Sequence, residues 1–175
     1  MAASAVPRWF FKRALIAGAL AVSSLVAGGL SGSTSAMADT ANFGRRSLAP
    51  GFGVDDGNVA GYTGGSYSFS AIANRDSNGN SCLGYGDPQP DYILTLEKDF
   101  AALELIVDSG GADTTLVVEG PGALWCGNDI DDFNLDARVL GKLVNAGSYR
   151  IWVGTMTPGD RQNYTLTISE EVNAE

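Results

Sequence analysis

The sequence contains no histidine. Serine and cysteine nucleophiles are commonly activated by a neighbouring histidine, which is also the commonest side-chain ligand of metals. Its absence therefore excludes the usual histidine-dependent hydrolase sites. A pair of carboxylates, as in glycoside hydrolases, remains an alternative because the chain has 20 acidic residues, but no motif singles out such a pair. We therefore predict that the protein is not an enzyme.

The chain also lacks a strongly apolar run long enough to span a membrane. Its longest apolar stretch, Ala14 to Leu30, is rich in alanine and glycine and falls short of the roughly 20 apolar residues that a spanning helix needs. Basic residues precede this stretch, and the small-x-small pattern Ala36-Met37-Ala38 follows it. Residues 1–38 are therefore predicted to be a signal peptide. We expect an exported protein, periplasmic or extracellular, with no stable membrane insertion after cleavage.

Basic residues are scarce, with 11 against 20 acidic ones. Three of the 11 lie in the predicted signal peptide, which leaves 8 basic residues against 20 acidic ones and a net charge of −12. Such a surface repels nucleic-acid phosphates and anionic lipid headgroups. The composition therefore excludes nucleic acid as a partner, whereas it supplies many carboxylates for a hard cation.

Only two cysteines are present, Cys82 and Cys126. An even cysteine count in an exported chain is typical of a disulfide. Two alternatives are a pair of buried free thiols and a shared metal, although two thiolates without histidine make a poor zinc site. We predict a disulfide between Cys82 and Cys126.

Long helical patterns are missing, and short strand patterns take their place. Between Asp91 and Ser169, apolar residues recur at every second position in runs broken by glycine, proline, asparagine and aspartate. The predicted core-facing residues are Tyr92, Leu94, Leu96, Leu103, Leu105, Val107, Thr114, Leu116, Val118, Tyr149, Ile151, Val153, Tyr164, Leu166 and Ile168. Weaker patterns at residues 58–63 and 66–72 indicate edge strands. The fold class is thus all-β, a single-domain antiparallel jelly-roll-like β-sandwich of about eight strands over residues 51–175, with residues 39–50 a flexible mature N-terminus.

Four segments in a fixed order resemble the bacterial pre-peptidase C-terminal (PPC) domain family. They are Asp113–Val118, Trp125–Asp129, Ala146–Gly154 and Tyr164–Ile168. The resemblance implies a secreted, non-catalytic accessory module for attachment to, or interaction with, another secreted protein or an extracellular polymer. The alternatives are a secreted hydrolase, a peptidase-associated protein and a carbohydrate-binding module. No peptidase domain accompanies the resemblance in this sequence, so it does not imply peptidase activity.

Oxygen ligands crowd the segment after the second cysteine. The predicted metal ligands are Asn128, Asp129, Asp131, Asp132 and Asp136. Ca²⁺ takes roughly 6–8 oxygen ligands, and neighbouring carboxylates repel one another unless a cation neutralises them. The alternative is a solvated turn whose side chains cap their own backbone. Calcium is therefore the one candidate cofactor. A second acidic stretch, Asp76 to Asn80, begins like a calcium loop but lacks its later ligands, so we expect an ordinary flexible loop there.

Three aromatic residues are candidates for stacking against sugar rings: Trp152, Trp125 and Tyr85. Packing in the core or on a sheet face is the alternative for aromatic residues on strands. Trp152 is the strongest candidate because the alternation places it opposite the core-facing Ile151 and Val153.

Overall fold

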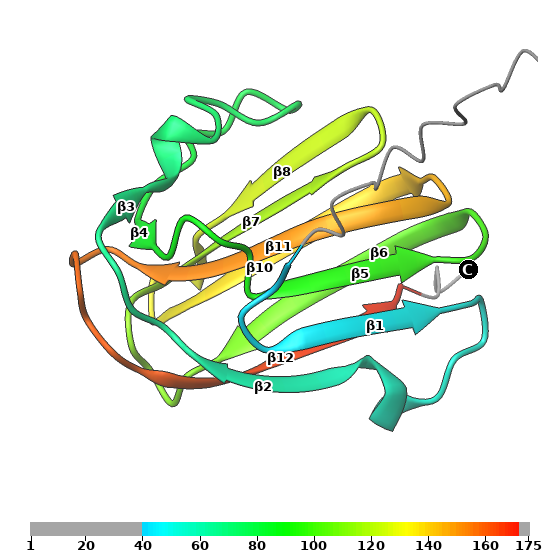
Figure 1. The fold of residues 1–175 in the computed structure, drawn as a ribbon, viewed down its shortest axis with the longest axis horizontal. Helices are drawn as coiled ribbons and strands as arrows, with labels where there is room; N and C mark the ends of the chain where they lie inside the picture. Colours follow the sequence, from blue (N-terminus) through cyan, green and yellow to red (C-terminus); the bar gives the residue numbers. More distant parts are fainter. Residues whose placement is uncertain (1–39, 172–175) are drawn as a thin grey trace, which may run out of the picture. The chain divides into compact units, whose positions relative to one another are not determined.

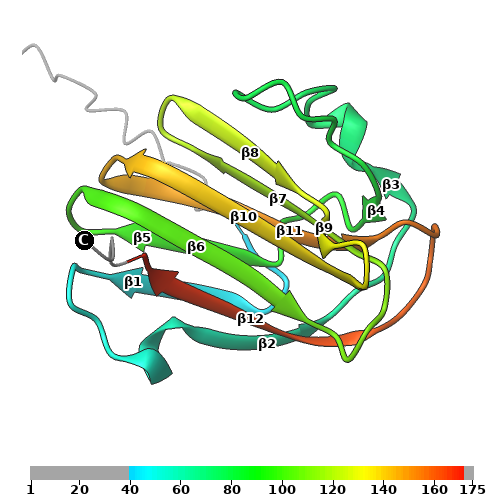
Figure 2. The ribbon, with the colours of Figure 1, turned by 180° about the vertical axis from the view of Figure 1, so that it is seen from behind.

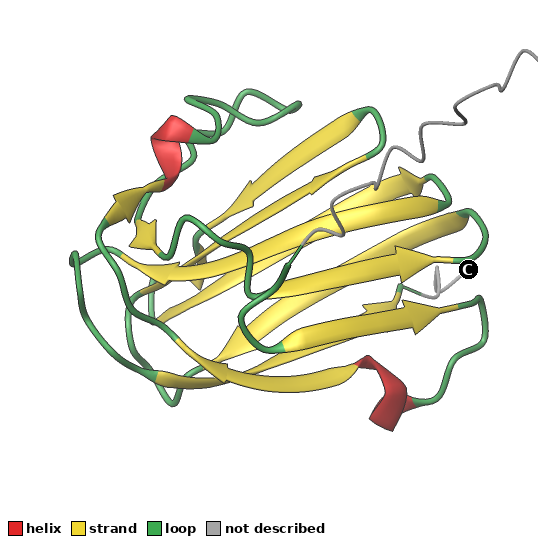
Figure 3. Cartoon of the chain, in the orientation of Figure 1, coloured by secondary structure: helices red, strands yellow, loops and turns green. Residues whose placement is uncertain are grey.

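The alternating strands form two β-sheets that pack face to face in a computed structural model that describes residues 40–171. Strands make up nearly all of the regular structure, and two short 3-10 helices, η1 (Val54–Gly57) and η2 (Phe69–Ala71), complete it (Figure 3). The described residues include no helix with the length and apolarity needed to cross a membrane. The predicted signal peptide, residues 1–38, lies outside them.

The first sheet has seven strands arranged around β11 (Figure 1). On one side of β11 lie β5 and then β1, and on the other side lie β7 and then β8. The short strand β4 pairs with the end of β11, and β3 pairs with β4. The bounds are β1 Gly44–Leu48, β3 Tyr67–Ser68, β4 Tyr85–Gly86, β5 Tyr92–Leu96, β7 Thr114–Gly120, β8 Ala123–Gly127 and β11 Gly147–Thr155.

The second sheet has five strands in the order β2-β12-β6-β10-β9, and it faces the viewer in Figure 2. All of its pairs are antiparallel. Its bounds are β2 Asn58–Tyr62, β6 Phe100–Asp108, β9 Asp129–Asp131, β10 Asn134–Val144 and β12 Asn163–Glu170. The edge position predicted for residues 58–63 is confirmed, because β2 pairs only with β12.

The core between the sheets contains the predicted faces of all five well-patterned strands. Fourteen of the fifteen predicted core-facing residues belong to one buried apolar cluster. The remaining one, Thr114, is fully buried, and its hydroxyl accepts a hydrogen bond from the backbone N–H of Ala137 at 2.9 Å. A slip of one residue would turn each apolar set away from the core, so the register of these strands is strongly specified. The all-β sandwich is confirmed.

The N-terminal strand β1 differs from the expected flexible segment. It runs parallel to β5, in register from Gly44 opposite Tyr92 to Leu48 opposite Leu96. The side chain of Leu48 is buried in the core, which fixes the end of the strand. This strand was not predictable from the sequence, because a glycine and two arginines interrupt any apolar period. In addition, its partner strand lies almost 50 residues further along the chain.

Residues 66–90, named here the covering segment, pack on the outer face of the first sheet. Phe69 from this segment joins Val117 and Trp152 in a second buried cluster, on the face opposite the main core. The close approach requires glycine at position 84, where φ is +94° and an added Cβ would lie 2.1 Å from the Thr115 hydroxyl. The predicted second edge strand is therefore only the short β3 followed by η2, because the chain turns there to cover the sheet.

Candidate functional site

The acidic segment forms the hairpin of β9 and β10, and it does not gather its carboxylates. Asp131 caps the turn, because its Oδ1 accepts hydrogen bonds from the N–H groups of Phe133 and Asn134 at 2.8 and 3.0 Å. Asp129 and Asp132 are exposed. Asp136 is buried, and it accepts hydrogen bonds from the N–H and the hydroxyl of Ser109.

Among residues 40–171, no three carboxylate, thiol or imidazole groups are placed to share a metal ion. The predicted ligand set Asn128, Asp129, Asp131, Asp132 and Asp136 is thus distributed along a hairpin instead of converging. The physical reason is that Asp131 and Asp136 are held by backbone and serine donors, while Asp129 and Asp132 are exposed to solvent. These residues do not fit a calcium site in this arrangement.

This arrangement predicts that calcium acts on stability only as a salt. Millimolar calcium chloride and sodium chloride at equal ionic strength should shift the melting temperature (Tm) equally, because both only screen an acidic surface. Differential scanning fluorimetry in calcium, magnesium, sodium and chelator measures this. A shift produced by calcium alone, and lost in Asp131→Ala, would contradict the prediction.

The three aromatic candidates do not form a common platform. Trp125 lies in the main core, stacked on Tyr149 with ring centroids 6.2 Å apart. Trp152 is on the face that the alternation predicted, but the covering segment buries it, and its indole N–H donates to the carbonyl of Pro88 at 3.3 Å. Tyr85 is half-buried in β4. Neither tryptophan ring is open to a ligand, because Trp125 is only 9% and Trp152 only 5% exposed.

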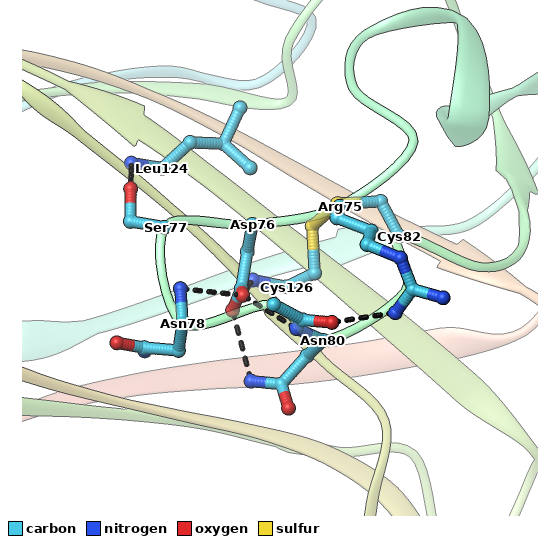
Figure 4. The surroundings of a disulfide bond; sticks show 9 residues. Arg75, Asp76, Ser77, Asn78, Asn80, Cys82, Leu124 and Cys126 are labelled. Carbon is cyan, nitrogen blue, oxygen red and sulfur yellow. Dashed lines mark hydrogen bonds between the residues drawn. A yellow bond between two sulfur atoms is a disulfide. The ribbon is translucent and has the colours of Figure 1, made fainter.

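The disulfide between Cys82 and Cys126 is present, as predicted (Figure 4). It links the covering segment to β8, with a sequence separation of 44 between the two cysteines. Asp76 organises the loop beside it, because its carboxylate accepts hydrogen bonds from the N–H groups of Asn78 and Asn80, both at 2.8 Å, and from that of Cys126 at 3.2 Å. Burial raises the pKa of Asp76, but these hydrogen bonds outweigh it and leave the pKa lowered.

The same loop caps the outer edge of β8. The N–H of Ser77 donates to the carbonyl of Leu124 at 2.9 Å, and the Ser77 hydroxyl accepts from the N–H of Leu124 at the same distance. An uncovered strand edge can pair with another chain, so the loop and the disulfide together protect this edge. The aspartate and serine of the stretch that begins like a calcium loop therefore have structural roles.

An open groove lies on the other side of the sandwich, along the seam between the edge strands β1 and β2. It consists of three adjoining hollows of about 540, 310 and 210 Å³, and Phe43 lines all three. We call it the seam groove. Its other polar, charged and aromatic lining residues include Asn42, Arg45, Arg46, Tyr62, Asp87, Asp91, Asp108, Arg161 and Asn163.

An aromatic pair and an arginine form the centre of the seam groove. Phe43 meets the ring of Tyr62 edge to face, with centroids 4.8 Å apart. The guanidinium carbon of Arg161 lies 3.6 Å from the centroid of the Tyr62 ring. Tyr62 retains 42% of its surface exposed, unusually much for a large aromatic ring in this chain. Stacking on an aromatic face orients a guanidinium while its N–H donors stay free to bind a ligand.

The buried carboxylate of Asp91 lines the hollow of about 310 Å³, which also contains Arg161. Asp91 is only 5% exposed, and it accepts hydrogen bonds from the N–H of Val153 at 2.7 Å and from the amide of Asn42 at 3.2 Å. Burial raises the pKa of Asp91 to about 7, and the negative charge of Asp87 adds to the effect, while the two hydrogen bonds oppose it. Burial and the proximity of Asp91 also raise the pKa of Tyr92 to about 12.

Three arginines line the seam groove, together with Asp87, Asp91 and Asp108, in a chain with a net charge of −9. Arg45, Arg46 and Arg161 line it, and none of the three has a carboxylate within 4.0 Å in the described part of the chain. By contrast, Arg138 pairs with Glu104, and Arg150 pairs with Glu119 at 2.8 Å. Arg75, the fourth arginine of residues 40–171 without a carboxylate partner, donates to the carbonyl of Gly79 instead, so three of these four arginines line the groove.

Sequence reasoning missed the seam groove because four segments far apart in the chain build it. They are residues 42–46, 59–65, 87–92 and 161–165, with Asp108 from β6. No local motif marks them. One signal was available, since Arg45-Arg46 is the only adjacent pair of basic residues after the predicted signal peptide in a strongly acidic chain.

A scan against protein-family models and a search of curated proteins gave no match to this chain. Solved structures do give matches. One is the PPC domain of collagenase from Bacillus anthracis, 11% identical, covering 71% of this chain and 94% of that one with a TM-score of 0.37. Another is CorA, a surface-associated copper-binding protein of Methylomicrobium album BG8, 9% identical, covering 75% and 100% with a TM-score of 0.45.

A third match is PliG of Aeromonas hydrophila, a periplasmic inhibitor of g-type lysozyme, 17% identical, covering 71% of this chain and 96% of that one with a TM-score of 0.34. At these identities the likeness concerns the fold alone. The class of protein that the two packed sheets define is a β-sandwich.

Proposed function

We propose that this protein is an exported, non-catalytic binding module and that it attaches to an extracellular polymer or a secreted partner through the seam groove. Export is supported by the signal-like N-terminus and by the disulfide, because disulfides persist in oxidising compartments. The proposal includes cleavage of residues 1–38 and a folded module of residues 51–175. Strand β1, within residues 39–50, pairs with this module.

One observation carries the proposal. The seam groove exposes an aromatic ring, Tyr62, held between Phe43 and a stacked arginine, with amide and carboxylate side chains around it. Binding surfaces commonly combine a rigid aromatic anchor with a few polar groups that fix orientation. The covering segment leaves this side of the sandwich open, whereas it closes the opposite edge.

A role without catalysis agrees with the groups in the seam groove. The chain has no histidine, and the two exposed carboxylates of the groove, Asp87 and Asp108, line different hollows of it. Asp91 has a raised pKa, as many catalytic acids do. However, its side chain is buried, and it accepts hydrogen bonds from Asn42, just before β1, and from Val153 in β11. We therefore assign Asp91 a structural role.

Binding to a panel of polysaccharides tests the proposal. The purified protein should be retarded in native gels that contain a bound polymer, and Tyr62→Ala should weaken the apparent affinity about fivefold to tenfold, because it removes the exposed anchor. Phe133→Ala is the matched control, since Phe133 is 98% exposed at the tip of the β9–β10 hairpin, away from the groove. It should bind like the unaltered protein.

Two results would contradict the proposal. If Phe133→Ala abolishes binding and Tyr62→Ala does not, the hairpin tip is the binding site. If the purified protein reproducibly hydrolyses casein or a polysaccharide, it is an enzyme and not a binding module.

A further inference from the structure

We propose that the seam groove recognises saccharide chains that carry carboxylate groups, such as chains of uronic acids, and that Arg161 binds the carboxylate. The inference rests on the proposed function, because it names the ligand class of the same groove. Three features of the groove support it, namely the free arginines, the oxygen acceptors of the groove and the position of the aromatic pair.

Arg161 is arranged as a receptor for a planar anion. Its guanidinium lies over the Tyr62 ring at 3.6 Å, so the plane of its five N–H donors is held in position before any ligand arrives. No carboxylate of residues 40–171 lies within 4.0 Å of it. A guanidinium fork matches a carboxylate with two parallel hydrogen bonds, which a single ammonium group cannot form. A carboxylate on the ligand completes this arrangement.

Two acidic groups of the groove favour a saccharide over a simple polyanion: Asp87 shares a hollow with Arg161, and Asp108 lines the adjoining hollow. Asp87 and Asp108 are exposed in the groove, and each uses one oxygen to accept from a nearby backbone N–H, at 2.8 and 3.1 Å. Their remaining oxygens are hydrogen-bond acceptors, for which the hydroxyl groups of a sugar ring are suitable donors. An acidic peptide or a polyphosphate has few such donors.

The seam groove can contact more than one acidic unit of such a chain. Arg45 and Arg46 line the hollow between β1 and β2, and Phe43 links this hollow with the one that contains Arg161. All three arginines are exposed and unpaired by carboxylates in the described chain. Carboxylates of a linear polymer can therefore meet cations in both hollows, which adds electrostatic attraction in a chain with an acidic net charge.

Isothermal titration calorimetry with matched polymers tests the inference. The probes are polygalacturonate, a neutral dextran of similar length, and poly-aspartate as a carboxylate polymer without sugar hydroxyls. The intact protein should bind polygalacturonate at least about tenfold more tightly than either other polymer, as one charge-assisted bidentate pair implies. Arg161→Gln should remove most of that preference. Arg161→Lys should restore only part of it, because lysine keeps the charge but not the fork.

Arg138→Gln is the matched control, since it removes an equal charge from an exposed arginine of β10 outside the groove. It should leave affinity for polygalacturonate within about twofold. Equal binding of dextran and polygalacturonate, with Tyr62→Ala still disruptive, would overturn the inference and leave the proposed function standing. Poly-aspartate binding as tightly as polygalacturonate would identify an acidic peptide as the ligand and also overturn the inference. If no polymer binds, in this titration or in the wider panel, neither the proposed function nor the inference about its ligand is supported.

Discussion

Replacing Asp91 with asparagine is expected to raise Tm at about pH 8 by on the order of 10 °C and to change it little at about pH 4. The pKa of this buried carboxyl is raised from 3.8 to about 7 in the folded protein. Between these values the folded state holds a proton that the unfolded state has released, so stability falls as pH rises toward 7. Above pH 7 the full destabilisation, at most about 4 kcal/mol, is present.

Asparagine is neutral at every pH, and its amide oxygen can still accept from the N–H of Val153. The gain in stability should therefore grow between about pH 4 and 8 and then stay constant. Asp108→Asn is the matched control, because Asp108 is an exposed carboxylate of the same groove and does not contribute to the raised pKa of Asp91. Thermal melts followed by circular dichroism across this range measure both variants. An Asp91→Asn variant that is less stable than the unaltered protein at pH 8 would show that the carboxylate stabilises the fold.

Removal of the disulfide is expected to have an effect of similar size and opposite sign. In the chain-entropy model, the Cys82–Cys126 link stabilises the folded state by about 4 kcal/mol, because it closes a loop with a sequence separation of 44. The double variant Cys82→Ala, Cys126→Ala should thus lower Tm by on the order of 10 °C. The single variant Cys126→Ser should do the same and leave Cys82 free to pair between chains.

The disulfide prediction has a second readout in tryptophan fluorescence. Loss of the link releases the covering segment from β8, so Trp152 should become more accessible to acrylamide, whereas Trp125 in the main core should not. Ser77→Ala is the control, because it removes one hydrogen bond to the β8 edge and keeps the disulfide. A double variant that melts within about 2 °C of the unaltered protein, with unchanged quenching, would mean that the covering segment is held without the disulfide.

The parts of the fold that follow from local pattern were predictable from the sequence. The alternation in β5, β6, β7, β11 and β12 identified the buried faces because one buried face fixes the register of a strand. The disulfide was predictable from the cysteine count and the export signal together. Trp152 was correctly assigned to the face opposite the main core.

The parts that depend on distant segments were not predictable. The parallel pairing of β1 with β5 joins residues nearly 50 positions apart, and nothing in Gly-Arg-Arg-Ser-Leu indicates it. The burial of Trp152 depends on the covering segment, whose own sequence is polar and rich in turn residues. The acidic hairpin concentrates oxygen ligands in sequence, but donors of the protein itself hold Asp131 and Asp136, and in residues 40–171 no three acidic groups converge. The seam groove was not predictable for the same reason, because its lining residues come from segments that are far apart in the sequence.

Amide chemical-shift mapping by NMR tests most directly the central claim that the seam groove is the binding site. Isotope-labelled protein is titrated with galacturonate oligosaccharides and, as the neutral counterpart, with dextran oligosaccharides. The account predicts that the shifted amides cluster at Phe43, Tyr62, Asp91 and Arg161, and that they saturate together. Shifts at Phe133 and its hairpin in place of these residues, or shifts in the covering segment over Trp152, would contradict it.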